Sequence, residues 1–328
     1  METCIKNNSF INSIMFAPYM APHYDYDPQL YFFISDDHHN AICASLIHPD
    51  GHHVNAEESL DGQIAVIIYC HGNACNVYTS TSFAFNLAIN LHCYVLSFDY
   101  IGYGLSQNTH SKLYANESTA CLSIQLVIDH VVINMNIPPS NIILWGESIG
   151  TGIATHGAKY CMENIGYEVA ALILASPYLS IKDLAQDISY FGSLVLQRIN
   201  TKENIKDIHC PLFIVHGIKD QVIPVSHGKI LLDMASNNYP KIGFFPSQAD
   251  HHHFDFKTLF KKVNLFLDEF VRSHICLSKY INITPRTPIH GQHIFGSYIY
   301  DNISAVMATS SELSCGVAKV ATSNCIIS

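Results

Sequence analysis

A serine between two glycines is the feature of this sequence that most directly suggests chemistry. It is Ser148 in the stretch Gly-Glu-Ser-Ile-Gly at 146–150, which follows the apolar run 142–145 and precedes helix-like sequence. In this setting the serine occupies a sharp turn between a strand and a helix, where larger residues in place of the glycines would collide with both. The turn lifts the hydroxyl above the sheet, over a helix N-terminus that stabilises developing negative charge. The pattern predicts a nucleophile.

A serine nucleophile needs a base and an acid that orients the base. In a strand–helix architecture these follow in the order Ser, Asp, His at the ends of later strands. Asp220 stands in a loop just beyond the apolar run 212–215. We assign it as the orienting acid.

Three consecutive histidines, 251–253, follow the apolar run 242–245 and lead into the last helix-like stretch. One of them is expected to be the base. We assign His251 to this role, with His252 as the alternative and His253 as the third choice. Adjacent imidazoles cannot all face one point, so we do not expect them to share a metal ion.

Two backbone N–H groups are needed to hold the oxyanion of an acyl-transfer intermediate. One is expected from Ile149, the residue after the nucleophile, and the other from the loop 71–74 that follows the first central strand. We assign the second donor to Asn73. His71 is interpreted as a structural hydrogen-bonding residue, and the glycine-rich stretch 99–106 as a turn that lines the same rim.

The elements that must position these residues alternate between short β-rich runs and longer amphipathic stretches from about residue 30 to 270. A hairpin is expected from the runs 31–35 and 41–47. Further strands are expected at 64–70, 93–98, 142–145, 170–175, 212–215 and 242–245. Helices are expected at 78–89, 114–133, 148–161, 181–198, 226–235 and 256–270. The alternation predicts an α/β fold with a mostly parallel central sheet and helices on both faces.

The chain is expected to hold one α/β domain, at 30–271, between two different ends. The N-terminal segment 1–29 has a small apolar patch at 10–20 that could pack on the domain or lie on a membrane. From 272 to 328 the alternation stops and Ser, Thr, Asn and Ile dominate, which predicts a poorly ordered tail. The segment 176–210 is too short for a large cap, so a small cap or none is expected.

Composition and charge exclude several classes of protein. Of the 328 residues, 48% are hydrophobic, which excludes wholesale disorder. The net charge of −10 argues against a nucleic-acid partner. The 11 Cys form no CxxC pair and no signal-peptide core opens the chain, which favours a reducing, cytoplasmic setting. No apolar run is long enough to span a bilayer, and neither a cofactor nor a metal is implied.

Several stretches together resemble the α/β-hydrolase superfamily and, within it, the alpha/beta-hydrolase domain-containing protein 17 family and its Bem-type relatives. They include Tyr-Cys-His-Gly-Asn-Ala at 69–74 and Phe-Asp-Tyr-Ile-Gly-Tyr-Gly at 98–104. The others are 146–151, 176–177, 216–224 and 226–228. They occur in the family's order with similar spacing, over roughly residues 60–270. The resemblance implies the α/β-hydrolase fold.

The resemblance also implies an activity, hydrolysis of the thioester that joins palmitate to cysteines of membrane-associated proteins. His251 would take the proton of Ser148, Ser148 would attack the thioester carbonyl, and water would then hydrolyse the acyl-serine. Two alternatives stay open. One is a carboxylesterase or monoacylglycerol-type lipase with the same three residues, and the other is a catalytically silent scaffold of the same fold.

The sequence departs from the family's pattern around the base. The family usually has a glycine shortly before the base and an aspartate two residues after it. Here Ala249 and Asp250 precede His251, and His253 takes the aspartate's place.

The stretch Cys-Ile-Ile-Ser at 325–328 forms a C-a-a-X box of the type usually farnesylated at its cysteine. Animal members of the family carry instead an N-terminal cysteine cluster that is palmitoylated, where this chain has only Cys4. We expect Cys325 to carry a prenyl anchor that holds the protein on the cytosolic face of a membrane. One prenyl chain binds reversibly, so a second signal is expected from Cys315 or the patch at 10–20.

Overall fold

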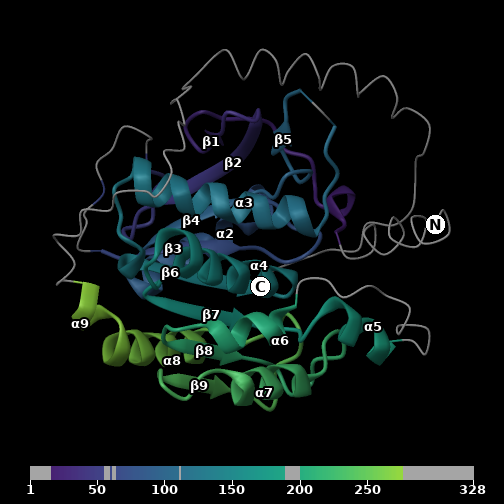
Figure 1. Cartoon of the computed structure of the whole chain (residues 1–328), viewed down its shortest axis with the longest axis vertical. Helices are drawn as coiled ribbons and strands as arrows, with labels where there is room; N and C mark the ends of the chain where they lie inside the picture. Colours follow the sequence, from purple (N-terminus) through teal and green to yellow (C-terminus); the bar gives the residue numbers. More distant parts are fainter. Residues whose placement is uncertain (1–15, 55–59, 61–63, 111, 189–199, 276–328) are drawn as a thin grey trace. The chain divides into compact units, whose positions relative to one another are not determined.

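The β-rich runs of the sequence form one mixed sheet, drawn as arrows in Figure 1. The computed structural model describes residues 16–54, 60, 64–110, 112–188 and 200–275. In these residues the sheet has nine strands in the order β1-β2-β4-β3-β6-β7-β8-β9, with β5 paired to β2. The strands are β1 (Phe32–Ser35), β2 (Asn40–Ile47), β3 (Val66–Cys70), β4 (Tyr94–Phe98), β5 (Gln107–Asn108), β6 (Ile142–Glu147), β7 (Ala171–Ala175), β8 (Leu212–Val215) and β9 (Lys241–Phe244).

The sheet is antiparallel at one end and parallel elsewhere. β1 and β2 form the expected hairpin, and β2 pairs antiparallel with β4. From β4 through β3, β6, β7 and β8 to β9, every neighbouring pair is parallel. The chain returns through a helix between successive parallel strands, so the carboxyl ends of these strands meet at one edge. The residues singled out in the sequence follow those carboxyl ends.

Helices cover both faces of the sheet (Figure 1). One face packs against α3 (Glu117–Asp129), α4 (Ile149–Tyr160), α5 (Ile181–Ile188) and α7 (Val225–Met234). The other face packs against α2 (Val77–Leu91), α8 (Phe256–Phe270) and α9 (Arg272–Ile275). Shorter helical segments are η1 (Pro18–Met20), η2 (His130–Asn134), η3 (Pro139–Asn141), η4 (Cys161–Ile165), α6 (Thr201–Asn204) and η6 (Ile205–Asp207).

Buried side chains of the central strands alternate between the two faces. In β6, Leu144 belongs to the core beside α3 and α4, whereas Ile143 and Trp145 belong to the core beside α2 and α8. All three side chains are buried. Because both faces are covered, such strands are apolar at every position, which explains the continuous apolar runs of the sequence.

The helices α2 and α3 begin at the same kind of cap. The side chains of Asn76 and Asn116 accept the N–H groups of Thr79 and Thr119, whose hydroxyls in turn accept the N–H groups of the asparagines. A cap of this kind contributes about 1 kcal/mol to helix stability. The fixed start of α2 also fixes the end of the loop 71–76 before it.

Both ends of the described chain pack on the sheet. Phe16 and Ala17 are buried against the domain, whereas residues 10–15 of the apolar patch lie outside the described residues. Residues 272–275, expected to begin the tail, form α9 instead. Ile275 is buried in the core beside α2 and α8, and Arg272 donates to the carbonyl of Leu91 at 2.8 Å. Cys315 and Cys325 lie outside the described residues. None of the described helices is long and apolar enough to cross a membrane.

The fold class predicted from the sequence is confirmed. Each predicted strand and helix occurs with its ends shifted by a few residues, and 189–198 of the helix expected at 181–198 lies outside the described residues. Between β7 and β8 the described residues hold two short helices, α5 and α6, and the turn η6, which agrees with a small cap. The two-residue strand β5 was not predicted.

Candidate active site

Ser148 stands at the turn between β6 and α4. Its backbone dihedrals are φ 52° and ψ −119°, a conformation that residues with a side chain rarely adopt. Its N–H donates to the carbonyl of Ala175 on β7 at 2.9 Å, which ties the turn to the sheet. Strained backbone of this kind persists only where the surrounding structure holds it, as at a turn that presents a reactive side chain.

Close packing at this turn requires Gly146 and Gly150. A Cβ at Gly150 would lie 2.1 Å from the carbonyl oxygen of Cys70, and one at Gly146 would lie 2.4 Å from that of Gly150. Such contacts do not occur in proteins, so any side chain would push α4 away from β3. The steric reason predicted for both glycines is confirmed.

The structure brings Ser148, His251 and Asp220 together. Nε2 of His251 lies 3.1 Å from Oγ of Ser148, and its Nδ1 lies 2.7 Å from Oδ2 of Asp220. A carboxylate only accepts hydrogen bonds, so Nδ1 carries the proton and Nε2 presents its lone pair to the hydroxyl. The imidazole can therefore accept the proton of Ser148 while the carboxylate stabilises the imidazolium that forms.

Both carboxylate oxygens of Asp220 are hydrogen-bonded. Oδ1 accepts the N–H groups of Val222 and Ile223 at 2.8 Å each. Oδ2 faces the imidazoles of His251 at 2.7 Å and His216 at 3.2 Å. Burial alone would raise the pKa of this carboxyl, but hydrogen bonds from His216, His251 and Ile223 outweigh burial and hold the pKa well below its usual range. Asp220 is therefore ionised.

His216 is a neighbour of this site that the sequence pattern did not indicate. It is fully buried, and its Nε2 lies 2.9 Å from the carbonyl oxygen of Ile223. Because a carbonyl only accepts, Nε2 carries the proton and shares it between Ile223 and Asp220. Gly228 makes room for the ring, since a Cβ there would lie 2.7 Å from Nδ1 of His216. The one signal in the sequence is a histidine directly after the run 212–215.

The other two adjacent histidines are exposed and held by Asp250. The N–H groups of His252 and His253 donate to Oδ1 of Asp250 at 3.0 and 2.9 Å, and the ring of His253 also bonds this carboxylate. The ring of His252 packs edge-on against that of His251, with centroids 4.5 Å apart. The geometry favours His251 over His252 as the base. In the part of the chain that the structure describes, no group of three or more His, Cys, Asp or Glu could hold a metal ion.

The loop 71–76 lies beside Ser148. A Cβ at Gly72 would lie 3.8 Å from Cβ of Ser148, and Asn73 is the next residue along the loop. Ile149 begins α4, where the first N–H groups have no partner within the helix. The structure thus places both residues assigned as oxyanion donors on backbone segments that flank the serine.

His71 and Asp99 support this loop from the buried side. The ring of His71 stacks on Tyr100 with centroids 4.3 Å apart, and its Nδ1 donates to the carbonyl of Gly72 at 2.8 Å. Burial lowers the pKa of His71 to about 4, so the ring is neutral. Burial also raises the pKa of Asp99 to about 6, against hydrogen bonds that lower it. The burial of His71 agrees with its interpretation as a structural residue.

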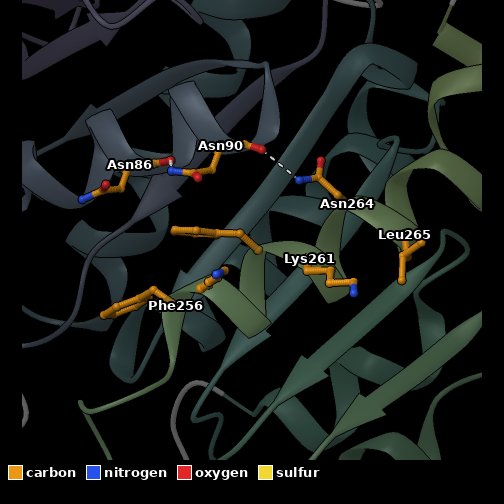
Figure 2. A pocket seen from close by; sticks show the side chains of 8 residues that line it. Asn86, Asn90, Phe256, Lys261, Asn264 and Leu265 are labelled. Carbon is orange, nitrogen blue, oxygen red and sulfur yellow. Dashed lines mark hydrogen bonds between the residues drawn. The ribbon is translucent and has the colours of Figure 1, made fainter.

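A separate hollow of about 560 Å³ lies between α2 and α8 (Figure 2). Phe256 and Phe260 supply apolar groups to it, and Lys257 and Lys261 supply charge. Asn264 and Asn90 both line the hollow, and Asn264 donates to the carbonyl of Asn90 at 2.8 Å. None of the three residues Ser148, Asp220 and His251 lines this hollow.

Comparison with known proteins identifies the family. The sequence pattern of the family described as serine aminopeptidase, S33, matches residues 62–202. The alpha/beta hydrolase L404 of Acanthamoeba polyphaga mimivirus is 31% identical over 207 residues, which are 62% of this chain and 73% of that protein. This chain belongs to the alpha/beta-hydrolase family.

The sequence of this chain is also similar to those of two animal proteins. Alpha/beta hydrolase domain-containing protein 17B of Homo sapiens is 32% identical over 169 residues, 51% of this chain and 54% of that protein. Lysophosphatidylserine lipase ABHD12 of Danio rerio is 28% identical over 242 residues, 66% of this chain and 60% of that protein. The resemblance to the domain-containing protein 17 family is confirmed. The chain nevertheless spans little more than half the length of these two relatives.

A solved structure supports the fold of this alpha/beta hydrolase. An esterase of Pyrococcus furiosus superposes with a TM-score of 0.57 at 14% identity, covering 76% of this chain and 96% of that one. At this identity the likeness concerns the fold alone.

Proposed function

We propose that this alpha/beta hydrolase is a serine hydrolase that removes long acyl chains from cysteines of membrane-associated proteins. The observation that carries the proposal is the hydrogen-bonded series from Ser148 through His251 to Asp220 at a strained turn. A serine hydroxyl becomes a nucleophile at neutral pH when an oriented imidazole can take its proton.

In the proposed reaction, Oγ of Ser148 attacks the thioester carbonyl carbon while its proton passes to Nε2 of His251. The N–H groups of Asn73 and Ile149 stabilise the oxyanion, and one such donor is typically worth about 10²–10³ in rate. Collapse of the intermediate breaks the carbon–sulfur bond, and the cysteine sulfur takes the proton from His251. Water then gives a proton to His251 and attacks the acyl-serine. Collapse of this second intermediate breaks the bond between the acyl carbon and Oγ, Oγ of Ser148 recovers its proton from His251, and the fatty acid is released. Asp220 keeps the ring in one tautomer throughout.

An apolar rim, formed by Tyr78, Ile218, Val222 and Phe256, supports a substrate with an acyl chain. Ile218 and Val222 are 46% and 53% exposed, in the loop after β8, and Phe256 is 37% exposed at the start of α8. Tyr78, in the first turn of α2, is 53% exposed. These positions all lie on segments that follow carboxyl ends of parallel strands, the edge of the sheet that also holds Ser148. Exposed apolar groups around a site suit an acyl chain or the lipid surface that holds it.

The leaving group separates the proposed function from its alternative. Resemblance to the domain-containing protein 17 family supports a thioester, and the small cap leaves room for an acyl group still attached to a protein. The match to a lysophosphatidylserine lipase favours a lipid ester instead. Both substrates would use the same three residues, because the acyl-serine intermediate is common to them.

A direct comparison of substrates tests the proposal. The full chain and a Ser148→Ala variant are given a palmitoyl-cysteine peptide, a monoacylglycerol and lysophosphatidylserine in the same vesicles. For each substrate, kcat/KM is divided by the rate constant of uncatalysed hydrolysis. The proposal predicts that this ratio is at least about tenfold higher for the thioester than for either lipid ester. A preference for the lipid esters would assign the lipase activity. Undiminished turnover by the Ser148→Ala variant would contradict the serine mechanism itself.

We propose in addition that the enzyme works at a membrane surface, with the apolar rim toward the lipid. Such an orientation would bring Ser148 to the acyl chains of proteins anchored there. Cys325 lies outside the described residues, and its prenylation stays a prediction.

A further inference from the structure

The chain segment 16–24, which precedes the first strand, packs against the loop that carries Asn73. Phe16 and Ala17 are each 2% exposed, and Phe16 is part of the core beside α3 and α4. Tyr24 is also buried, and its ring stacks on that of Tyr78 in the first turn of α2. The segment is therefore an integral part of the domain on the side of the predicted oxyanion hole.

The first tie between segment and loop is made to the side chain of Asn73. The N–H of Ala17 donates to Oδ1 of Asn73 at 2.8 Å. The same oxygen accepts the hydroxyl of Tyr103 at 2.9 Å and the N–H of Ala74 at 3.0 Å. An amide oxygen has two lone pairs, so three donors saturate it and fix the side chain. A fixed side chain also restricts the rotation of the backbone that carries the Asn73 N–H.

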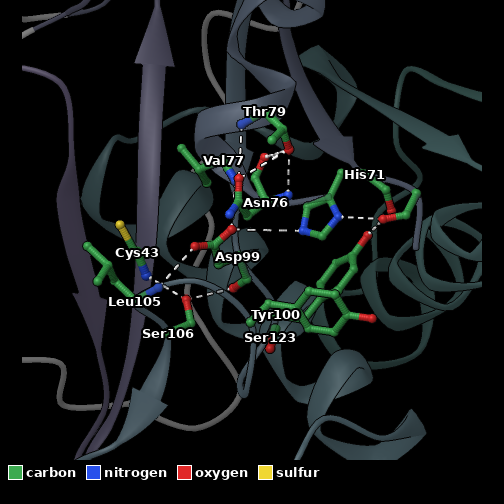
Figure 3. A network of polar contacts seen from close by, with 12 residues as sticks. Cys43, His71, Asn76, Val77, Thr79, Asp99, Tyr100, Leu105, Ser106 and Ser123 are labelled. Carbon is green, nitrogen blue, oxygen red and sulfur yellow. Dashed lines mark hydrogen bonds and ion pairs between the residues drawn. The ribbon is translucent and has the colours of Figure 1, made fainter. Parts of the chain in front are cut away.

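The second and third ties reach the start of α2. Asn76, the N-cap of α2, donates through Nδ2 to the carbonyl of Pro22 at 2.7 Å. The hydroxyl of Tyr24 donates to Asp99, whose other oxygen accepts the N–H of Val77 at 2.7 Å. Figure 3 shows Asp99 between Val77 and the ring of His71. The segment thus holds both the middle and the end of the loop 71–76.

We infer that residues 16–24 position the oxyanion hole. They hold the loop 71–76 so that the Asn73 N–H faces the oxyanion. The inference rests on the proposed function. An oxyanion donor acts where charge develops in the transition state, so its displacement lowers kcat and leaves substrate binding largely unchanged. Loss of one support is expected to displace the donor without removing it, at a cost of about tenfold in kcat.

Two truncations test the role of the segment. One chain begins at Phe16 and the other at Pro18, each after an initiating Met, so they differ by Phe16 and Ala17 alone. We expect the chain that begins at Pro18 to lose about tenfold in kcat relative to the other, with KM within about twofold. Equal kcat values in the two folded chains would overturn the inference.

A pair of tyrosine variants tests the same inference without truncation. Tyr24→Phe removes a hydroxyl from Asp99, and Tyr160→Phe removes one from Asp129, which it contacts at 2.9 Å. Burial raises the pKa of both carboxyls to about 6, so the two losses are chemically matched. Tyr160 ends α4, about 18 Å from Ser148 along the helix axis. Only Tyr24→Phe is expected to lower kcat, and an equal effect of both variants would contradict the inference.

Amide hydrogen exchange of the loop 71–76 separates failure of this inference from failure of the proposed function. The chain that begins at Pro18 and the Tyr24→Phe variant should exchange faster in this loop than their controls, whether or not the enzyme hydrolyses thioesters. Unchanged exchange in both would overturn the inference even if the full chain is active. If the chain that begins at Pro18 does not fold, the Tyr24→Phe result decides.

Discussion

At the scale of single residues, Asp220 is held by more donors than an orienting acid requires. It accepts two backbone N–H groups and faces two imidazoles, one from His251 and one from the buried His216. The motif at 146–150 selected Ser148, and the order Ser, Asp, His then selected Asp220 after the run 212–215. It did not reveal His216, because the loop 216–223 must turn back before this ring can reach the carboxylate.

His216 gives the first prediction. His216→Gln weakens a hydrogen bond to Asp220, so the pKa of the Asp220 carboxyl rises toward its usual range. The carboxylate then holds the ring of His251 less firmly. We expect kcat to fall about tenfold in the folded variant, measured with a thioester substrate. His156→Gln is the matched control, since His156 bonds Gln125 on the covered face of α4. Equal kcat values for the two variants would refute the role of His216.

At the scale of elements, strands were easier to predict than the contacts between loops. Strands buried on both faces are apolar at every position, so their runs stand out in the sequence. The choice among three adjacent histidines depends on how Asp250 folds the turn, and the packing of residues 16–24 depends on partners more than 50 positions away. Neither kind of contact leaves a periodic pattern in the sequence.

The junction of β6 and α4 gives the second prediction. In Gly150→Ala the new Cβ would lie 2.1 Å from the carbonyl oxygen of Cys70, so α4 must move away from β3 and from the loop 71–76. We expect a loss of kcat of at least about 10² and a lower Tm, measured by thioester turnover and thermal unfolding. Gly166→Asn is the control, because nothing lies within 4 Å of a Cβ there and asparagine tolerates its positive φ. A Gly150→Ala variant with normal kcat would show that the close approach is not needed.

At the scale of the whole molecule, buried groups link stability to pH. The pKa of His71 is lowered by burial from 6.5 to about 4, so the unfolded chain binds its proton more readily than the folded chain between these values. Protonation of His71 in the unfolded chain therefore lowers the free energy of unfolding by about 2–3 kcal/mol as the pH falls from 7 to 4.5. Asp99, whose pKa is raised from 3.8 to about 6, acts in the opposite direction over the same range.

A comparison of two proteins isolates the contribution of His71. His71→Gln removes the titrating ring, so the variant should lose about 2–3 kcal/mol less than wild type between pH 7 and pH 4.5. Urea unfolding at several pH values measures this difference. Parallel curves for the two proteins would show that burial of His71 does not carry the acid sensitivity.

The apolar rim gives a prediction about membranes. Ile218 and Val222 stand at the edge of the sheet that holds Ser148, whereas Ile133, 40% exposed in η2, precedes β6 and stands near the opposite edge. Changing Ile218 and Val222 together to serine should weaken binding of the chain to lipid vesicles by about tenfold or more. Ile133→Ser should leave binding unchanged in the same sedimentation assay. An equal loss in both variants, or in neither, would rule out the rim as the lipid-facing surface.

The central claim is that Ser148 is a nucleophile activated by His251. Labelling of the full chain with a fluorophosphonate probe tests it most directly, with Ser148→Ala, His251→Ala and His252→Ala beside wild type. We expect rapid labelling of wild type and of His252→Ala and no labelling of Ser148→Ala. The labelling rate of His251→Ala should be at least about 10³-fold lower than that of wild type. A folded wild-type chain that does not react with the probe would show that Ser148 is not an activated nucleophile.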